Sequence, residues 1–195
     1  GGALRAEHGA LTGRGPARGR AVARRPAVAS APVPGCAWAH PYADAMPIIY
    51  LIRHGKASPE AEDYDELSPT GYEQSRLLGV ELKRRDLRVE RAVAGTLRRQ
   101  RQTAAATLAA AGLDADERWN EYDHLGLLGS GPARQGTLQE RLDASLSSWI
   151  GAGGEGPGTW EGFRAGVRGA LEDLISGSGR GGTTLVFTSA GVIAT

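Results

Sequence analysis

The chain has 195 residues, of which 41% are hydrophobic, and a formal net charge of +1. This length suits one domain with a sizeable core. The single cysteine, Cys36, excludes an internal disulfide framework, and no apolar run is long enough to cross a bilayer. The first 46 residues hold six arginines and two acidic residues, so 17 bases and 20 acids remain for the rest of the chain. This balance gives no support for a nucleic-acid or membrane partner.

Residues 1–45 are predicted to be a disordered leader. They are rich in Gly, Ala, Arg and Pro and lack the large apolar groups needed to offset the entropy of ordering. They also lack the apolar stretch of a signal peptide, so we expect a cytoplasmic protein. Met46 is a candidate start of translation, and we expect one folded domain over residues 46–195.

The first predicted element is a strand over residues 47–52 (PIIYLI), followed directly by Arg53, His54 and Gly55. A short apolar run rich in β-branched residues is typical of a strand buried on both faces of a parallel sheet. Ligands bind at the carboxyl ends of such strands, so Arg53 and His54 stand where chemistry is usually done. Alone, an Arg-His-Gly after a strand favours the alternative, a capped strand whose Arg and His are merely solvated.

The remaining elements follow in chain order. Thr70 and Glu73 fit a capping box at the start of a helix that runs to about Arg85. The apolar patterns then predict strands over 89–95, 117–120 and 183–188, helices over 99–111, 138–150 and 160–175, and a glycine-rich loop over 126–136. Strands that alternate with helices predict an α/β fold with a mostly parallel sheet. Because a crossover helix normally follows a last strand, we expect a fragment that lacks its C-terminal elements.

A second cationic group stands at the next junction between a strand and a helix. Residues 97–104 (LRRQRQTA) place Arg99 beside a helix N-terminus, whose free N–H groups and dipole favour an anion. Guanidinium groups bind phosphate oxygens in a fork geometry. Alone, these arginines favour a solvated helix start. Two strand ends that each offer an arginine, one beside His54, make a phosphate pocket a candidate.

Three linked motifs carry a family resemblance. Residues 51–57 (LIRHGKA), 67–71 (LSPTG) and 97–104 (LRRQRQTA) resemble the histidine phosphatase superfamily, the phosphoglycerate mutase-like group, in the same order over residues 46–195. The resemblance implies a three-layer α/β/α sandwich and a reaction without metal or other cofactor. By it, His54 is the nucleophile that becomes phosphorylated, Arg53 and Arg99 hold the phosphoryl group, and Glu121 is the proton donor.

The chain departs from the family pattern at one place. Ser189 stands where the family carries a second histidine, and a serine offers a hydrogen bond but no charge. Ser189 is therefore assigned to phosphate binding. His124, three residues after Glu121, is a candidate to replace the lost imidazole; the alternative is a surface or structural histidine in a loop.

The leading hypothesis is a metal-independent phosphomonoester hydrolase that acts through a phosphohistidine at His54. Its expected substrate is a small phosphorylated metabolite or a phosphoprotein. The alternatives are a catalytically weakened phosphate- or phosphoprotein-binding relative, favoured by Ser189, and a phosphoglycerate mutase-type phosphotransferase. The sequence does not define the oligomeric state or the natural substrate.

Overall fold

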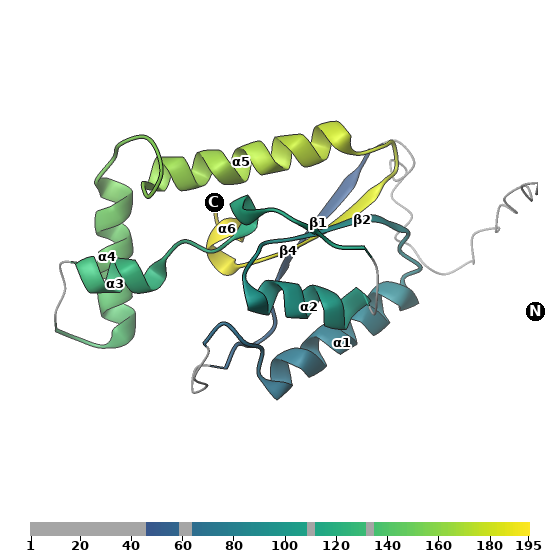
Figure 1. The fold of residues 1–195 in the computed structure, drawn as a ribbon, viewed down its shortest axis with the longest axis horizontal. Coiled ribbons are helices and arrows are strands. Elements are labelled where there is room, and N and C mark those ends of the chain that lie inside the picture. The colour runs from purple at the N-terminus through teal and green to yellow at the C-terminus, as the bar shows by residue number, and fades with distance from the viewer. Residues whose placement is uncertain (1–45, 59–63, 109–111, 132–134) are drawn as a thin grey trace, which may run out of the picture. The chain divides into compact units, whose positions relative to one another are not determined.

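The computed structural model of this protein describes residues 46–58, 64–108, 112–131 and 135–195. The predicted leader, residues 1–45, lies outside the described residues, as does the end of the second predicted helix at 109–111. Strands and helices alternate along the described chain (Figure 1). The strands are β1 (Ile48–Arg53), β2 (Val89–Ala94), β3 (Asp114–Ala115) and β4 (Thr183–Thr188), and the helices are α1 (Pro69–Arg84), α2 (Arg98–Leu108), α3 (His124–Ser130), α4 (Leu138–Gly151), α5 (Trp160–Gly177) and α6 (Ala190–Ile193), with a 3₁₀ turn η1 (Glu117–Trp119) before α3.

The four described strands form one sheet in the order β1-β4-β2-β3, and every pair is parallel. Their carboxyl ends therefore lie along the same edge, where the segments after β1 and β4 meet. β4 lies between β1 and β2, and all six of its residues are buried. This arrangement confirms the predicted α/β fold with a parallel sheet.

Helices cover both faces of the sheet and make it the middle of three layers (Figure 1). On one face Val93 and Val186 pack with Leu174 of α5. On the other face Leu185 and Phe187 pack with residues of α1 and α2. Neighbouring residues of one strand thus face opposite layers, as the two-residue period of a strand requires.

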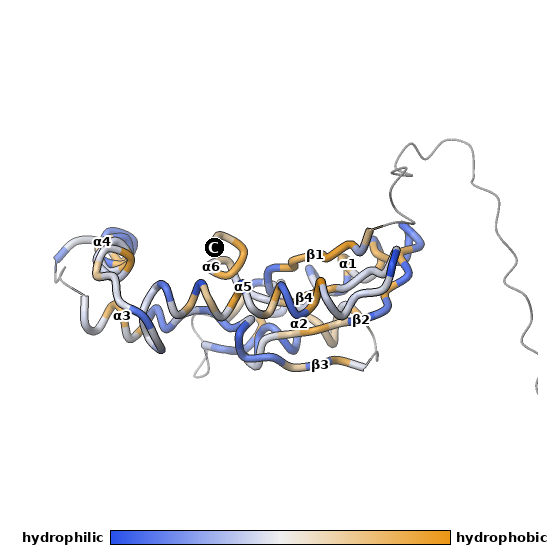
Figure 2. The backbone as a smooth tube through the Cα atoms, turned by 90° about the horizontal axis from the view of Figure 1, so that it is seen from above, coloured by the Kyte–Doolittle hydropathy of each residue, from blue (hydrophilic) through white to orange (hydrophobic). Residues whose placement is uncertain are grey.

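The prediction that β1 is buried on both faces is wrong for the described sheet. β1 is an edge strand, and Ile48 and Leu51 keep 37% and 39% of their surface exposed. Figure 2 shows its apolar run in orange at the opposite edge from β3. An apolar run shows that a strand favours burial, but its position in the sheet depends on pairing with distant segments, which the run does not encode.

Helix α1 begins earlier than predicted, and its N-cap is Ser68 instead of Thr70. The Ser68 hydroxyl accepts a hydrogen bond from the Gly71 N–H at 3.1 Å. Pro69 then occupies the first turn, where its fixed φ suits a helix and its missing N–H costs nothing. The proline therefore sets the start of this helix.

Two further predictions are wrong near the middle of the chain. The stretch 117–120 is the 3₁₀ turn η1, because the Asp116 carboxylate accepts from the Arg118 N–H and turns the chain. The first half of the predicted loop 126–136 belongs to helix α3, which Asp123 caps by accepting from the Gly126 N–H at 2.9 Å. This cap and the packing of α3 against α4 offset the low helix propensity of its glycines.

Candidate active site

The end of β1 presents the first group of site residues. The His54 N–H donates to the Thr188 carbonyl at 2.9 Å, which extends the β1–β4 pairing by one step. The Gly55 N–H then donates to the Thr103 hydroxyl of α2 at 3.0 Å. A side chain at position 55 would meet the Gly71 carbonyl oxygen of α1, so this buried turn requires glycine. The imidazole is thereby fixed between the sheet and two helices.

Both ring nitrogens of His54 have a partner. Its Nδ1 lies 2.8 Å from the Gly55 carbonyl oxygen, and its Nε2 lies 3.2 Å from Nε of Arg99. A carbonyl oxygen only accepts and a guanidinium only donates, so together they select the neutral tautomer with its proton on Nδ1. The lone pair of Nε2 therefore points toward the Arg99 guanidinium.

Burial and the neighbouring positive charges favour the neutral form of His54. Burial is the largest cause that lowers the pKa of His54 below 6.5, and the positive charges of Arg99 and Arg53 lower this pKa further. The Gly55 carbonyl and the Asp65 carboxylate act in the opposite direction. The structure thus brings the two predicted arginines from two different strand ends to one imidazole.

Arg99 is held in place by an acidic residue from the loop before α1. Its guanidinium is almost fully buried, and Nη1 lies 2.5 Å from Oδ1 of Asp65. The same carboxylate accepts from the Arg98 N–H at 2.6 Å, at the N-terminus of α2. Asp65 therefore joins the start of α2 to the side chain that faces His54.

An aromatic ring connects this cluster to His124. The ring centroid of Tyr64 lies 5.9 Å from Cζ of Arg99 and 5.7 Å from the ring centroid of His124. His124 is the first residue of α3 instead of a loop residue. The structure therefore brings this predicted residue to the neighbourhood of Arg99.

Glu121 follows the 3₁₀ turn η1 and contacts helix α6, which comes directly after β4. Its Oε2 accepts from the Gly191 N–H at 3.1 Å, and its Oε1 accepts from the Tyr122 N–H at 3.3 Å. Gly191 belongs to α6, three residues beyond the end of β4. The carboxylate is half-buried and stands at the same edge as Arg53 and His54.

Ser189 is placed differently from the other predicted residues. It is fully buried, and its hydroxyl accepts a hydrogen bond from Nε2 of Gln100 at 2.8 Å. The same Nε2 donates to the Trp119 carbonyl at 3.0 Å. A direct contact between Ser189 and a phosphate group therefore stays a prediction.

Open space adjoins the imidazole on the side of α1. A cavity of about 330 Å³ is lined by Arg53 and His54 from the end of β1, with Gln74, Ser75 and Leu78 from α1. Arg99 meets the ring elsewhere, at Nε2. Among the described residues, this open space therefore reaches Arg53 and His54 but is not lined by Arg99 or Glu121.

Sequence reasoning missed Asp65 and Gln100. Asp65 is 33 residues before Arg98, and no local pattern connects the two. Gln100 was part of a recognised motif, but only the fold shows that its amide reaches Ser189, 89 residues away. Thr103 follows Arg99 by one helical turn, and its hydroxyl donates to the Arg99 carbonyl. This spacing was the one feature of the sequence that could have placed Thr103 beside the site.

The described residues contain no group of three or more His, Cys, Asp or Glu side chains arranged to hold a metal ion. Among the same residues, no helix combines the length and the apolar character that a bilayer span demands.

A family model describing the histidine phosphatase superfamily (branch 1) matches residues 49–195. The chain belongs to the histidine phosphatase superfamily. A comparison with curated proteins gave no match.

Several solved structures share the fold of this superfamily member. A phosphoglycerate mutase from Bacillus anthracis has a TM-score of 0.54 at 20% identity, covering 77% of this chain and 78% of that one. A mycobacterial glucosyl-3-phosphoglycerate phosphatase in complex with VO3 has a TM-score of 0.54 at 21% identity, covering 74% and 76%. A mutant phosphoserine phosphatase from Entamoeba histolytica in complex with phosphoserine has a TM-score of 0.52 at 17% identity, covering 75% of each chain. These similarities confirm the predicted phosphoglycerate mutase-like fold.

The electrostatic role of Arg53 is testable by NMR titration of His54. Arg53→Gln removes one positive charge and should raise the pKa of His54, while leaving it below 6.5 because burial is the larger cause. Arg118→Gln, which removes a charge paired with Asp116 and Asp173, is the control and should leave this pKa unchanged. An equal pKa in wild type and Arg53→Gln would contradict the placement of Arg53.

Because native His54 has a lowered pKa, its contribution to the free energy of unfolding should be lost as the pH falls below 6.5.

Proposed function

We propose that this chain is a metal-independent phosphomonoester hydrolase that works through a phosphohistidine at His54. The proposal rests on two contacts of the His54 ring, Nδ1 with the Gly55 carbonyl and Nε2 with Nε of Arg99. Together they leave the lone pair of Nε2 facing the Arg99 guanidinium. A nucleophilic imidazole needs this neutral form, with its other nitrogen held by a hydrogen bond. A phosphoryl group that displaces the Arg99–His54 contact would meet the nucleophile and a buried cation together.

The proposed reaction has two steps. In the first, Nε2 of His54 bonds to phosphorus, the bond from phosphorus to the ester oxygen breaks, and Glu121 gives that oxygen a proton. Arg53 and Arg99 stabilise the charge on the phosphoryl oxygens while the group moves. In the second step a water oxygen bonds to phosphorus, the bond from phosphorus to Nε2 of His54 breaks and its electron pair returns to the imidazole, the water proton passes to Glu121, and inorganic phosphate leaves.

A small phosphorylated metabolite is the proposed substrate class. Support comes from structures with the same fold that are named as phosphatases of glucosyl-3-phosphoglycerate and phosphoserine. The similarity to a phosphoglycerate mutase keeps phosphoryl transfer as a second candidate. The neutral Ser189 at the family's second histidine position keeps a weakened phosphate- or phosphoprotein-binding role as a third.

His124 is proposed as the second imidazole of the site, in place of the one that Ser189 lacks. Its ring packs against Tyr64 at an interplanar angle of 52°, and Tyr64 in turn lies against the Arg99 guanidinium that contacts His54. Ser189 is proposed to act mainly through Gln100, which holds the end of β4 in position.

The nucleophile is tested by His54→Ala. The turnover of p-nitrophenyl phosphate should fall by about 10³-fold or more, and the acid-labile phosphoenzyme trapped by rapid quenching should disappear. Equal thermal unfolding of variant and wild type controls for folding. A phosphoenzyme that persists in His54→Ala would overturn the proposal, whereas wild-type phosphate binding without turnover would favour the binding role.

The proton donor is tested by comparing two leaving groups in Glu121→Gln. A poor alkoxide leaving group needs its proton in the transition state, so kcat for methyl phosphate should fall by about 10²- to 10⁴-fold. The p-nitrophenolate ion leaves without protonation, so kcat for p-nitrophenyl phosphate should change much less. An equal loss for both esters would show that Glu121 is not the general acid.

The role of His124 is tested by a pair of substitutions. His124→Leu should lower kcat by about 10²-fold, as expected when one donor to a transition-state oxygen is removed. His124→Gln keeps an N–H donor and should recover part of the loss. Unchanged turnover in His124→Leu would assign this histidine to the surface of α3.

A further inference from the structure

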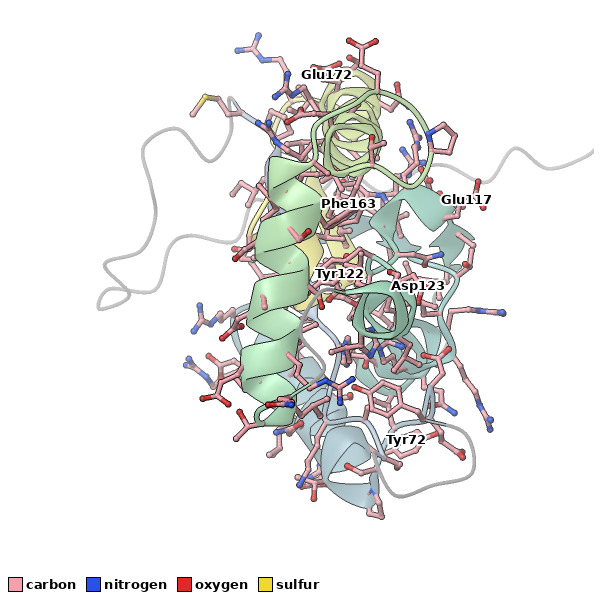
Figure 3. The ribbon with its side chains drawn as sticks, turned by 90° about the vertical axis from the view of Figure 1, so that its left-hand side faces the viewer. Tyr72, Glu117, Tyr122, Asp123, Phe163 and Glu172 are labelled. Atoms are coloured by element: carbon pink, nitrogen blue, oxygen red, sulfur yellow. The ribbon has the colours of Figure 1, made fainter. Side chains whose placement is uncertain are left out.

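A cluster of aromatic side chains lies beside Glu121, away from the arginines. Tyr122, Trp149, Trp160 and Phe163 form five ring pairs, tilted or edge-to-face, with ring centroids 5.4–6.0 Å apart. Figure 3 shows Tyr122 and Phe163 next to each other beside α4. All four rings are only half-buried, and Phe163 alone of them packs against the core between α5 and the sheet.

Three of these four rings line a cavity of about 420 Å³ between α3, α4 and α5. Its walls include Tyr122, Leu127, Trp149, Pro157 and Phe163. A volume in this range, with mostly apolar walls, is typical of a pocket for a small organic ligand. The Trp149 indole N–H donates to the Gly158 carbonyl at 2.8 Å, which fixes the orientation of one wall.

The cavity adjoins the proposed proton donor. Tyr122 follows Glu121 directly, and a side chain built on Gly191 would meet both the Glu121 carboxylate and the Tyr122 ring. Gly191 therefore lies against both the Glu121 carboxylate and the Tyr122 ring. In the proposed reaction the oxygen that receives the proton from Glu121 belongs to the leaving group, so this group lies next to the residue that precedes Tyr122.

The charges near the cavity indicate which leaving group fits. Asp123 is the one charged residue among the described residues that line it. Burial raises the pKa of the Tyr122 hydroxyl, and the negative charges of Glu121 and Asp143 raise it further. A leaving group with its own carboxylate or phosphate would be repelled here, whereas a neutral aromatic ring would pack on the exposed faces.

We propose that this cavity binds the leaving group of the substrate, and that the substrate is a phosphomonoester of an uncharged aromatic alcohol or phenol. The inference rests on the proposed phosphatase activity, since it assigns the leaving-group side of the same site. It differs from the substrates named for the structural neighbours, glucosyl-3-phosphoglycerate and phosphoserine.

The test compares benzyl phosphate with methyl phosphate, whose leaving alcohols have similar acidity. Burial of the ring should raise kcat/KM for benzyl phosphate by about 10- to 100-fold over methyl phosphate. Leu127→Trp fills the cavity from α3 and should reduce this ratio toward one. Leu125→Trp adds the same side chain on the same helix at a position that is 62% exposed, and should keep the ratio.

The outcomes separate the two proposals. Turnover that depends on His54 but shows no benzyl preference, or a preference that Leu127→Trp leaves intact, overturns the aromatic pocket and leaves the phosphatase standing. If wild type hydrolyses neither ester, the proposed function fails, and the pocket is judged by binding of benzyl alcohol in saturation-transfer NMR. Binding lost in Leu127→Trp and kept in Leu125→Trp supports the pocket; absence of binding to wild type overturns it.

Discussion

The contact between the Arg99 guanidinium and Nε2 of His54 is the interaction on which the site depends. It joins the segment after β1 to helix α2 across 45 residues of sequence, and it selects the form of the imidazole that can attack phosphorus. The contact is possible because Asp65 holds Arg99 from its other side. Two cations near a half-buried histidine would otherwise repel each other, and the carboxylate reduces that repulsion.

The fold supplies this geometry through parallel pairing. β1 and β4 end at the same edge, so the residues that follow them share one small volume although 135 positions separate Arg53 from Thr188. Helix α2 starts at the same edge and contributes Arg99, Gln100 and Thr103 within little more than one turn. Arg99 and Thr103 reach His54 and the Gly55 N–H in the segment after β1, and Gln100 reaches Ser189 in the segment after β4.

Local patterns predicted much of this architecture. β4 spans the predicted residues 183–188, and helices α4 and α5 lie where the apolar spacing placed them. The errors occurred where a single polar contact or a distant pairing overrides the pattern: Ser68 and Pro69 at the start of α1, the Asp116 turn, and the Asp123 cap of α3. The apolar pattern also gave the wrong burial for β1. β4, with its three threonines, is an inner strand with all six residues buried, while the more apolar β1 lies at the edge of the sheet. Within the site, sequence motifs named His54 and both arginines, but Asp65 and the aromatic cavity required the fold.

The Asp65 carboxylate also bears on how the site handles its product. Two positive side chains, Arg53 and Arg99, and one negative side chain, Asp65, act on the imidazole. Their net charge is near +1 when His54 is neutral. A dianion such as inorganic phosphate is attracted, yet it must share Arg99 with a carboxylate that is already in place. In the proposed reaction Asp65 would therefore compete with the phosphate product for Arg99, an arrangement that favours release of phosphate over its retention.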